Sequence, residues 1–473
     1  MAEQGTAGRQ ATTTGQQPSR LAGLLAVAND QLRQRLATGA GRMALTVLGI
    51  RIAGAGLAYL SQVLLARWMG ADDYGVFAVV WTLALVLGLL ASLGFSASPG
   101  RFVPTYLAAN QMDRLRGFLS ASRLLALFTA GLATLIGLEI LWWSRAVIDP
   151  VYVWPAAIAL LAVPFFALTG VQDAIARSQD LPALGLLSSF IYRPLLLLAL
   201  ILPLVLAGQP VTAAIAAILA VAAHFLTTAH QAWRLQRQLN ARVPAGPHRY
   251  ELKLWIGVSL PLLMVEGFLQ LLSSADVIMV SFWQPPEQVA VYFAASKTLA
   301  MVHFVHFAVR SASAHRFAGL AAGRDQTHLA VYARQASRWT FWPSLAGGLA
   351  LLLLSPLLLA MFGPQFVEGV PLMAILLIGV LARASIGPAD ALLGMTGHQK
   401  SCAFVYAGVF AVNVAFNAAL IPAYGLVGAA VATTLAMIAE AIALAVVSRR
   451  KLGFIPFALV PNKRSVVSKA GAQ

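Results

Sequence analysis

Long apolar segments dominate this sequence and restrict the folds that the chain can adopt. An α-helix needs roughly 20 apolar residues to cross the hydrocarbon core of a membrane. Twelve segments are close to this length, and we expect a transmembrane helix in each. They cover residues 44–67, 75–98, 119–143, 151–172, 182–206, 211–232, 254–282, 289–311, 338–362, 369–393, 402–422 and 426–447. The predicted fold class is therefore an all-α polytopic membrane protein.

The composition agrees with this fold class and excludes several functions. Only 11% of the 473 residues are charged, against roughly 25% in soluble domains. The net charge of +16 would suit a nucleic-acid-binding protein. Here, however, the basic residues lie in short runs between apolar segments, so we expect no nucleic-acid partner. The single Cys402 excludes a disulfide framework, and the absence of a P-loop excludes a built-in ATPase.

Lys and Arg predict the orientation, because cytoplasmic loops carry an excess of both. Of the 33 Lys and Arg residues, 26 lie on the face that holds both termini, and the other face has only Arg67 and Arg145. We therefore expect both termini in the cytoplasm. The predicted regions are a cytoplasmic tail with an interfacial amphipathic helix (1–43, the helix over 20–42), a first lobe (44–233), a linker (234–253), a second lobe (254–447) and a basic tail (448–473).

The two predicted lobes are related in sequence. When residues 68–123 are laid without a gap on the chain 215 positions later, identical residues coincide along the whole span. The pairs are Trp68 with Trp283, Val76 with Val291, Arg101-Phe102 with Arg316-Phe317, Gln111 with Gln326 and Ala121-Ser122-Arg123 with Ala336-Ser337-Arg338. Two such halves predict pseudo-symmetric six-helix lobes, and transporters usually bind their substrates between repeats of this kind.

Two stretches carry a resemblance to a known family. Residues 64–78 read Leu-Leu-Ala-Arg-Trp-Met-Gly-Ala-Asp-Asp-Tyr-Gly-Val-Phe-Ala, and residues 413–453 run from Asn-Val-Ala-Phe-Asn to Arg-Arg-Lys-Leu-Gly. They resemble the polysaccharide-exporter (Wzx-type) branch of the multidrug/oligosaccharidyl-lipid/polysaccharide (MOP) exporter superfamily. The resemblance implies a MATE-like fold of twelve helices around a central cavity, in the bacterial inner membrane.

The same resemblance implies a function. A chain of this family is expected to move a polyprenyl-pyrophosphate-linked oligosaccharide across the bilayer by alternating access, for exopolysaccharide, O-antigen or capsule synthesis. A polysaccharide polymerase and glycosyltransferases are the expected protein partners. We expect a transporter rather than an enzyme, and no cofactor besides coupling to Na⁺ or H⁺.

Charged residues inside membrane segments are costly and therefore mark candidate sites. Arg51 and Gln62 share one polar, small-residue stripe of the first segment, and a pyrophosphate requires the forked hydrogen bonding that Arg supplies. The alternative for each cation is a buried carboxylate partner or a snorkelling side chain, and we favour snorkelling for Arg310 and Arg383. The candidate substrate-binding residues are Arg51, Gln62, Arg193, Lys297, His303 and Arg310.

Polar residues of the second lobe form a candidate ion-coupling site. Oxygen ligands suit a hard cation such as Na⁺, and the placement resembles the sodium site of the lipid II flippase branch. The second polar position of the eleventh helix is Asn417 here, which lowers the negative charge and leaves proton coupling as the alternative. A polar cluster that only joins helices is the other alternative. The candidates are Asp276, Glu266, Asn413, Asn417 and Thr433.

Three other functions are alternatives. A cation-coupled multidrug exporter of the MATE type would favour an acidic cavity, yet the first lobe's segments contain only Glu139 as an acid. A membrane glycosyltransferase or ligase would be expected to carry a large external loop, which this chain lacks. A scaffold for a polysaccharide synthase has no direct signal. Arg101 and Arg316 either flank a cavity mouth or bind lipid headgroups, and we favour headgroup binding.

Overall fold

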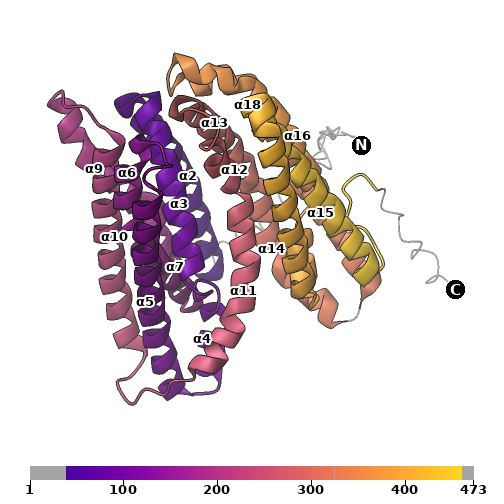
Figure 1. The fold of residues 1–473 in the computed structure, drawn as a ribbon. Helices are drawn as coiled ribbons and strands as arrows, with labels where there is room; N and C mark the ends of the chain where they lie inside the picture. The colour runs from indigo at the N-terminus through magenta and orange to yellow at the C-terminus, as the bar shows by residue number, and fades with distance from the viewer. Residues whose placement is uncertain (1–38, 324, 461–473) are drawn as a thin grey trace, which may run out of the picture.

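The computed structural model describes residues 39–323 and 325–460, and every regular element within these ranges is a helix (Figure 1). The predicted all-α fold class is confirmed. The predicted interfacial helix at 20–42 falls almost entirely outside the described residues. The helices of the first half are α2 (Gly39–Met69), α3 (Ala71–Ala91), α4 (Pro99–Ala108), α5 (Met112–Ser144), α6 (Pro150–Leu160), α7 (Val163–Ser178), α8 (Pro182–Leu187), the π-helix η1 (Ser188–Tyr192), α9 (Arg193–Leu206) and α10 (Ala213–Arg242).

The second half lies beside the first and follows a related plan (Figure 1). The predicted linker 234–253 is partly helical, because α10 continues to Arg242 and residues 243–251 make the connection. The helices of the second half are α11 (Leu252–Leu272), α12 (Ala275–Val280), α13 (Pro286–Leu299), the 3₁₀-helix η2 (Ala300–Val302), α14 (His303–Ala322), α15 (Gln326–Ala360), the 3₁₀-helix η3 (Pro364–Gly369), α16 (Val370–Ser385), α17 (Ala389–Met395) and α18 (Gln399–Leu452).

The described helices account for all twelve predicted segments. Ten are long and apolar enough to cross a membrane, and the pair α6 and α7, bent by 42°, adds an eleventh. The 54-residue α18 contains two of the predicted segments, because Gly425 breaks it with φ 57° and ψ −134°. The Leu420 carbonyl lies against Gly428, although a straight helix would separate them by about 12 Å. The two arms of α18 therefore fold back at Gly425.

The sequence repeat is visible in the packing of α3 against α13. An offset of 215 residues carries α3 onto α13 and η2, and α5 onto α15. The equivalent helices α3 and α13 pack directly against each other. At Gly75 a Cβ atom would lie 1.9 Å from the Pro286 carbonyl oxygen, so only glycine permits this approach. Small residues promote such close contact in membranes, where burial of apolar surface does not drive helices together.

The helical domain has two ends, which we name the linker end and the far end. Residues 243–251 cross the linker end, and Gly70 and the Gly425 turn lie at the far end. At the far end α2 bonds to the last turn of α15. Arg67 donates from Nε to the Met361 carbonyl (2.6 Å) and from Nη2 to the Ala360 carbonyl (2.8 Å). These carbonyls have no partner within their own helix and attract positive charge.

Aromatic rings fill the space behind this contact. Tyr59 donates from its hydroxyl to the Leu358 carbonyl (3.0 Å), and its ring centroid lies 5.5 Å from that of Phe362. Tyr74, fully buried, packs against Phe293 and Phe366 of the second half. The two halves are therefore in direct contact at the far end.

Each half is crossed at the linker end by the segment that follows its last helix. Residues 243–251 bind α5, where Arg116 donates to the carbonyls of Pro247 (2.9 Å) and Pro244 (2.8 Å). Residues 453–460 bind α15 in the same way, because Arg338 donates to the carbonyls of Ala458 (3.0 Å) and Val460 (2.7 Å). Arg116 and Arg338 thus hold the backbone of these segments.

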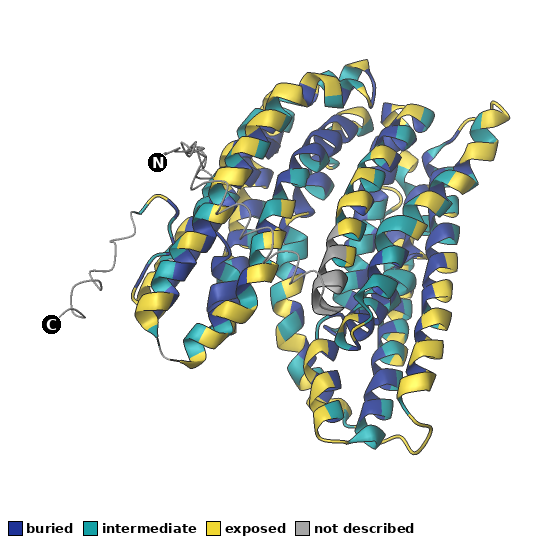
Figure 2. Cartoon of the chain, turned by 180° about the vertical axis from the view of Figure 1, so that it is seen from behind, coloured by how far each residue is buried: buried dark blue, intermediate teal, exposed yellow. Residues whose placement is uncertain are grey.

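Helix α11 joins the two halves. Its first turn lies in the first half, where the fully buried Trp255 donates from Nε1 to the Tyr106 hydroxyl (2.9 Å). Its last turns lie in the second half, where Phe268 packs against Phe410 with ring centroids 6.2 Å apart. Pro261 lies between these contacts. Figure 2 shows buried residues inside each half and exposed residues on outward helix faces, as expected for helices that face lipid.

We predict that Arg67 helps to keep the far end closed. Replacing Arg67 with Ala removes two charge-assisted hydrogen bonds to α15, each worth about 1.5–3 kcal/mol when shielded and less at this exposed position. Spin labels at Asp72→Cys and Glu368→Cys, both exposed at the far end in opposite halves, report the separation in a Cys402→Ser background. The fraction of long distances should rise about threefold to tenfold.

The control is Arg145→Ala. Arg145 is also exposed at the far end, but its guanidinium stacks 3.7 Å from the Trp142 ring within the first half. Equal distance distributions in the Arg67→Ala and Arg145→Ala proteins would contradict a closing role for Arg67.

Candidate functional site

A cavity of about 2400 Å³ lies between the two halves. The first half contributes α2, α4 and α7 to its wall, and the second half contributes α11, α14, α17 and α18. Its lining includes Asp180, just beyond α7, and Gln399 and Lys400 at the start of α18, so the cavity extends to the linker end. The halves thus touch at the far end and enclose a cavity toward the linker end.

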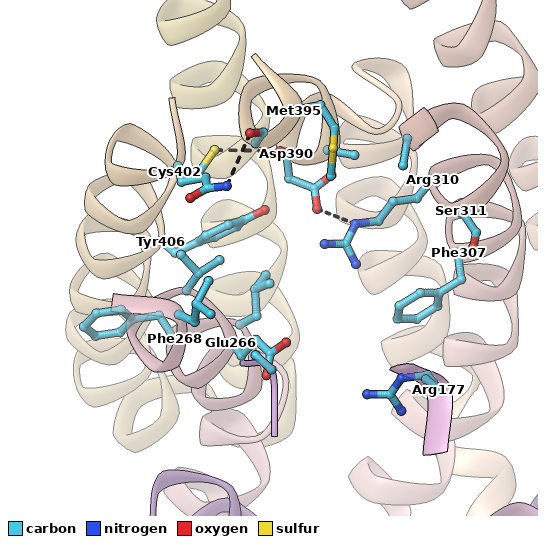
Figure 3. Close-up of a pocket in the computed structure, with 18 of the residues that line it drawn as sticks. Arg177, Glu266, Phe268, Phe307, Arg310, Ser311, Asp390, Met395, Cys402 and Tyr406 are labelled. Atoms are coloured by element: carbon cyan, nitrogen blue, oxygen red, sulfur yellow. Dashed lines mark hydrogen bonds and ion pairs between the residues drawn. The ribbon is translucent and has the colours of Figure 1, made fainter. Parts of the chain in front are cut away.

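The charged residues of the described cavity wall are mostly basic. The Lys and Arg side chains number five, against three carboxylates. The basic residues are Arg51, Arg101, Arg177, Arg310 and Lys400, and the acidic ones are Asp180, Glu266 and Asp390. Figure 3 shows Arg177 across the open space from Glu266, on the same side of the view as Phe307 and Arg310. Three of the arginines, Arg51, Arg101 and Arg177, take part in no ion pair within the described part of the chain.

The structure brings three of the predicted site residues to this wall: Arg51, Arg310 and Glu266. Glu266 also links the halves, since its Oε2 accepts a hydrogen bond from the Ser96 hydroxyl (3.4 Å). Arg101, for which we favoured headgroup binding, lies on the cavity wall as well. Its repeat partner Arg316 instead stacks 4.5 Å from the Tyr332 ring.

Four predicted substrate-binding residues do not line the cavity. Gln62 accepts a hydrogen bond from the Tyr74 hydroxyl (2.9 Å) toward the far end. Lys297 lies 5.1 Å from the centroid of the Phe293 ring, and His303 begins α14. Arg193 lies among the helices of the first half, 5.7 Å from the centroid of the Phe166 ring.

Arg193 belongs to a polar cluster inside the first half. Its charge is attracted by Asp173, which accepts hydrogen bonds from Gln231 (2.6 Å) and Ser189 (3.0 Å). Nearby, the hydroxyls of Thr169 and Thr228 are 2.8 Å apart. This arrangement explains why a costly cation is tolerated away from the cavity.

The candidate ion-coupling residues of the second half, apart from Glu266, are buried. Asp276 accepts a hydrogen bond from the Tyr292 hydroxyl (2.8 Å), which lies 3.4 Å from the Thr433 hydroxyl. The Asn417 side chain donates from Nδ2 to the Asn413 carbonyl (2.9 Å) and Oδ1 (3.1 Å). Asn413 Nδ2 and Asn417 Oδ1 are buried without a partner in the described residues.

The snorkelling interpretation of Arg310 and Arg383 was wrong. Arg310 Nε lies 2.8 Å from Asp390 Oδ2, and Arg383 Nε lies 3.1 Å from Glu440 Oε1. Both cations are turned toward carboxylates of the same half, because pairing inside the protein avoids the cost of an isolated buried charge. Arg383 and Glu440 are absent from the cavity wall, whereas Arg310 and Asp390 belong to it.

Sequence reasoning missed Arg177. Arg177 follows the predicted segment 151–172, so the sequence predicts it in a cytoplasmic loop, but α7 continues to Ser178 and presents Arg177 to the cavity. No sequence pattern distinguishes Arg177 from other basic residues at segment ends. The Ser96 contact with Glu266 was also missed, because it depends on how the two halves meet.

The fold is shared with solved transporters of low sequence identity. An inward-facing MATE-family multidrug resistance transporter of the MOP superfamily matches at 16% identity and TM-score 0.66, covering 90% of this chain and 98% of the other. The lipid II flippase MurJ, in an inward closed conformation, matches at 13% identity and TM-score 0.66, covering 86% and 87%. A MOP superfamily transporter from Pyrococcus furiosus matches at 14% identity and TM-score 0.62, covering 87% and 95%.

A family comparison supports the resemblance found in the sequence. No curated protein matches the chain significantly. The profile of a family described as "Polysaccharide biosynthesis protein" matches residues 40–313, which is more than half of the chain. The chain therefore belongs to this polysaccharide biosynthesis protein family.

Proposed function

We propose that the protein is a flippase that carries a polyprenyl-pyrophosphate-linked oligosaccharide across the bacterial inner membrane. The observation that carries this proposal is the mainly basic cavity between two repeated halves, closed at the far end and extending to the linker end. Family membership and a fold shared with MOP transporters support it.

The cavity wall suits an anionic lipid headgroup. Arg51, Arg101 and Arg177 have no ion-pair partner in the described residues, so their guanidinium groups are available to phosphate oxygens. Aromatic side chains complete the wall on the second half, where Phe404 is 76% and Phe307 48% exposed. Such a wall can contact apolar chain and sugar faces while the arginines hold the pyrophosphate.

The orientation predicted from Lys and Arg places the linker end in the cytoplasm. With that orientation the cavity accepts cargo from the inner leaflet, and the far-end contacts prevent its release outside. Transport then requires the far end to open while the linker end closes. Glycosyltransferases are the proposed partners before this step, and a polysaccharide polymerase is the proposed partner after it.

A coupling ion supplies the driving force in this proposal. Asp276, Thr433 and the two asparagines offer oxygen ligands for Na⁺, and the unpartnered Asn417 Oδ1 leaves one ligand position free. Proton binding by Asp276 or Glu266 is the alternative. Multidrug extrusion fits the fold equally well, but cationic drugs would meet a wall with more basic than acidic groups.

The cavity arginines provide the first test of this function. We expect Arg51→Gln and Arg177→Gln each to weaken binding of a polyprenyl pyrophosphate to the purified protein about 10- to 100-fold. The physical reason is that each loses a charge-assisted hydrogen bond worth about 1.5–3 kcal/mol. In cells, the double variant should accumulate lipid-linked repeat units on the inner leaflet.

The matched control is Arg237→Gln. Arg237 stacks 5.1 Å from the Trp233 ring and does not line the cavity. If the double cavity variant binds the lipid as tightly as the Arg237→Gln protein does, the phosphate site is misplaced.

Asp276 provides a separate test of coupling. In proteoliposomes with an imposed Na⁺ or H⁺ gradient, we expect Asp276→Asn to reduce gradient-driven flipping at least about tenfold, because the amide removes the charge that attracts the ion. Lipid binding should change by less than about twofold, since Asp276 does not line the cavity. Glu368→Gln, at an exposed acid of the far end, is the control. Gradient-driven flipping that survives in Asp276→Asn at the control's rate would rule out this coupling site.

A further inference from the structure

The four cavity arginines are not equivalent. Arg51, Arg101 and Arg177 on the first half form no ion pair with a described residue, whereas Arg310 on the second half is paired with Asp390. Figure 3 shows Arg310 extending from α14 toward Asp390 at the edge of the open space. Arg310, one cation of the proposed phosphate site, is therefore already paired with an anion of the protein, Asp390.

The two partners differ in their exposure. The Arg310 side chain is 41% exposed and the Asp390 side chain 9%. A ligand in the cavity can thus reach the guanidinium of Arg310 while Asp390 stays in the wall. The Nε to Oδ2 distance of 2.8 Å is that of a charge-assisted hydrogen bond. Asp390 Oδ1 accepts no hydrogen bond from a described residue, so the paired arrangement is not the forked one that a phosphate group can form.

Asp390 has a second neighbour that could stabilise it without Arg310. Its Oδ1 atom is buried and accepts no hydrogen bond from any described residue. His306 Nε2 lies 3.9 Å from that oxygen, one turn before Arg310 on α14. Arg383 on α16 is paired with Glu440, and its charge also attracts Asp390. From α18, Cys402 approaches the Asp390 carbonyl at 3.9 Å. A small movement of His306 would supply the partner that a buried carboxylate requires.

We propose that Asp390 competes with the cargo for Arg310. The pyrophosphate of the cargo displaces Asp390 from Arg310 on binding, and Asp390 pairs with Arg310 again when the cargo leaves. This inference rests on the proposed flippase function. Asp390 would then lower the affinity for anionic lipids and favour their release, since a transporter that holds its cargo too tightly cannot discharge it. Asp390 acts here as a positioning residue for Arg310 and does not itself contact the cargo.

The second half offers a matched control. Arg383 and Glu440 form a similar ion pair of 3.1 Å, and Glu440 is fully buried. Neither residue lines the cavity. A substitution in this pair tests what the loss of a buried ion pair does to the protein without freeing a cavity cation.

The test measures binding of farnesyl pyrophosphate and of a polyprenyl pyrophosphate to the purified full-length protein in lipid nanodiscs. Asp390→Asn should tighten binding about three- to tenfold, because Arg310 is freed. Arg310→Gln should weaken binding. The Asp390→Asn/Arg310→Gln double variant should bind as the Arg310→Gln variant does, because Asp390 affects binding only through Arg310. Glu440→Gln should leave the dissociation constant within about twofold of the wild-type value.

The possible outcomes separate this inference from the function on which it rests. If the wild-type protein binds neither lipid, the proposed function fails and the role of Asp390 fails with it. If the wild type binds but Asp390→Asn binds equally or more weakly, only the competitor role is overturned. Should Asp390→Asn fail to fold, Asp390→Glu replaces it. That variant keeps the anion and should bind no tighter than the wild type, so a tighter Asp390→Glu would overturn the proposal.

Discussion

The contact of α3 with α13 is the interaction on which the rest of the structure depends. These helices are equivalent in the two halves, and Gly75 lets them approach until the Pro286 carbonyl touches the α3 backbone. Hydrogen bonds from Arg67 and Tyr59 to the last turn of α15 lie beside the α3–α13 contact at the far end. The two helical bundles meet at one end and leave space at the other, and the cavity lies there. Helix α11, with Trp255 in one half and Phe268 against the other, keeps the halves connected across that space.

The second constraint is the cost of charge inside a membrane. Removing one partner of a buried ion pair costs about 3–5 kcal/mol, so a cation in this protein must lie near an anion of its own half or face water or cargo. Arg383 with Glu440, and Arg193 near Asp173, satisfy the constraint within a half. Arg51 and Arg177 satisfy it by facing the cavity. The distinction between structural and functional arginines follows from the partners rather than from the position along a helix.

The sequence predicts the fold better than the site. The lengths of the apolar runs locate all twelve segments, because hydrophobicity is a local property of the sequence. The repeat from Trp68 onward predicts two equivalent halves, because it recurs at a constant offset. The continuation of α7 to Ser178 extends the fourth predicted segment and brings Arg177 to the cavity. Arg51 was found because a polar stripe on one helix indicates a wall. Arg193 and Lys297 do not line the cavity. The helix face that turns toward the cavity depends on how neighbouring helices pack, and the sequence of one helix does not specify this.

The central claim is that the two halves rock against each other, so that the far-end contacts open as the linker end closes and one basic cavity faces each side of the membrane in turn. The most direct measurement is the distance between spin labels at Ser178→Cys and Gln399→Cys, which lie on opposite halves at the linker end, in a Cys402→Ser background in nanodiscs. A polyprenyl-pyrophosphate-linked oligosaccharide should produce a population with a shorter distance, and the headgroup-free polyprenol should not. A single distance that is unchanged by cargo, by the polyprenol and by an ion gradient would contradict the account.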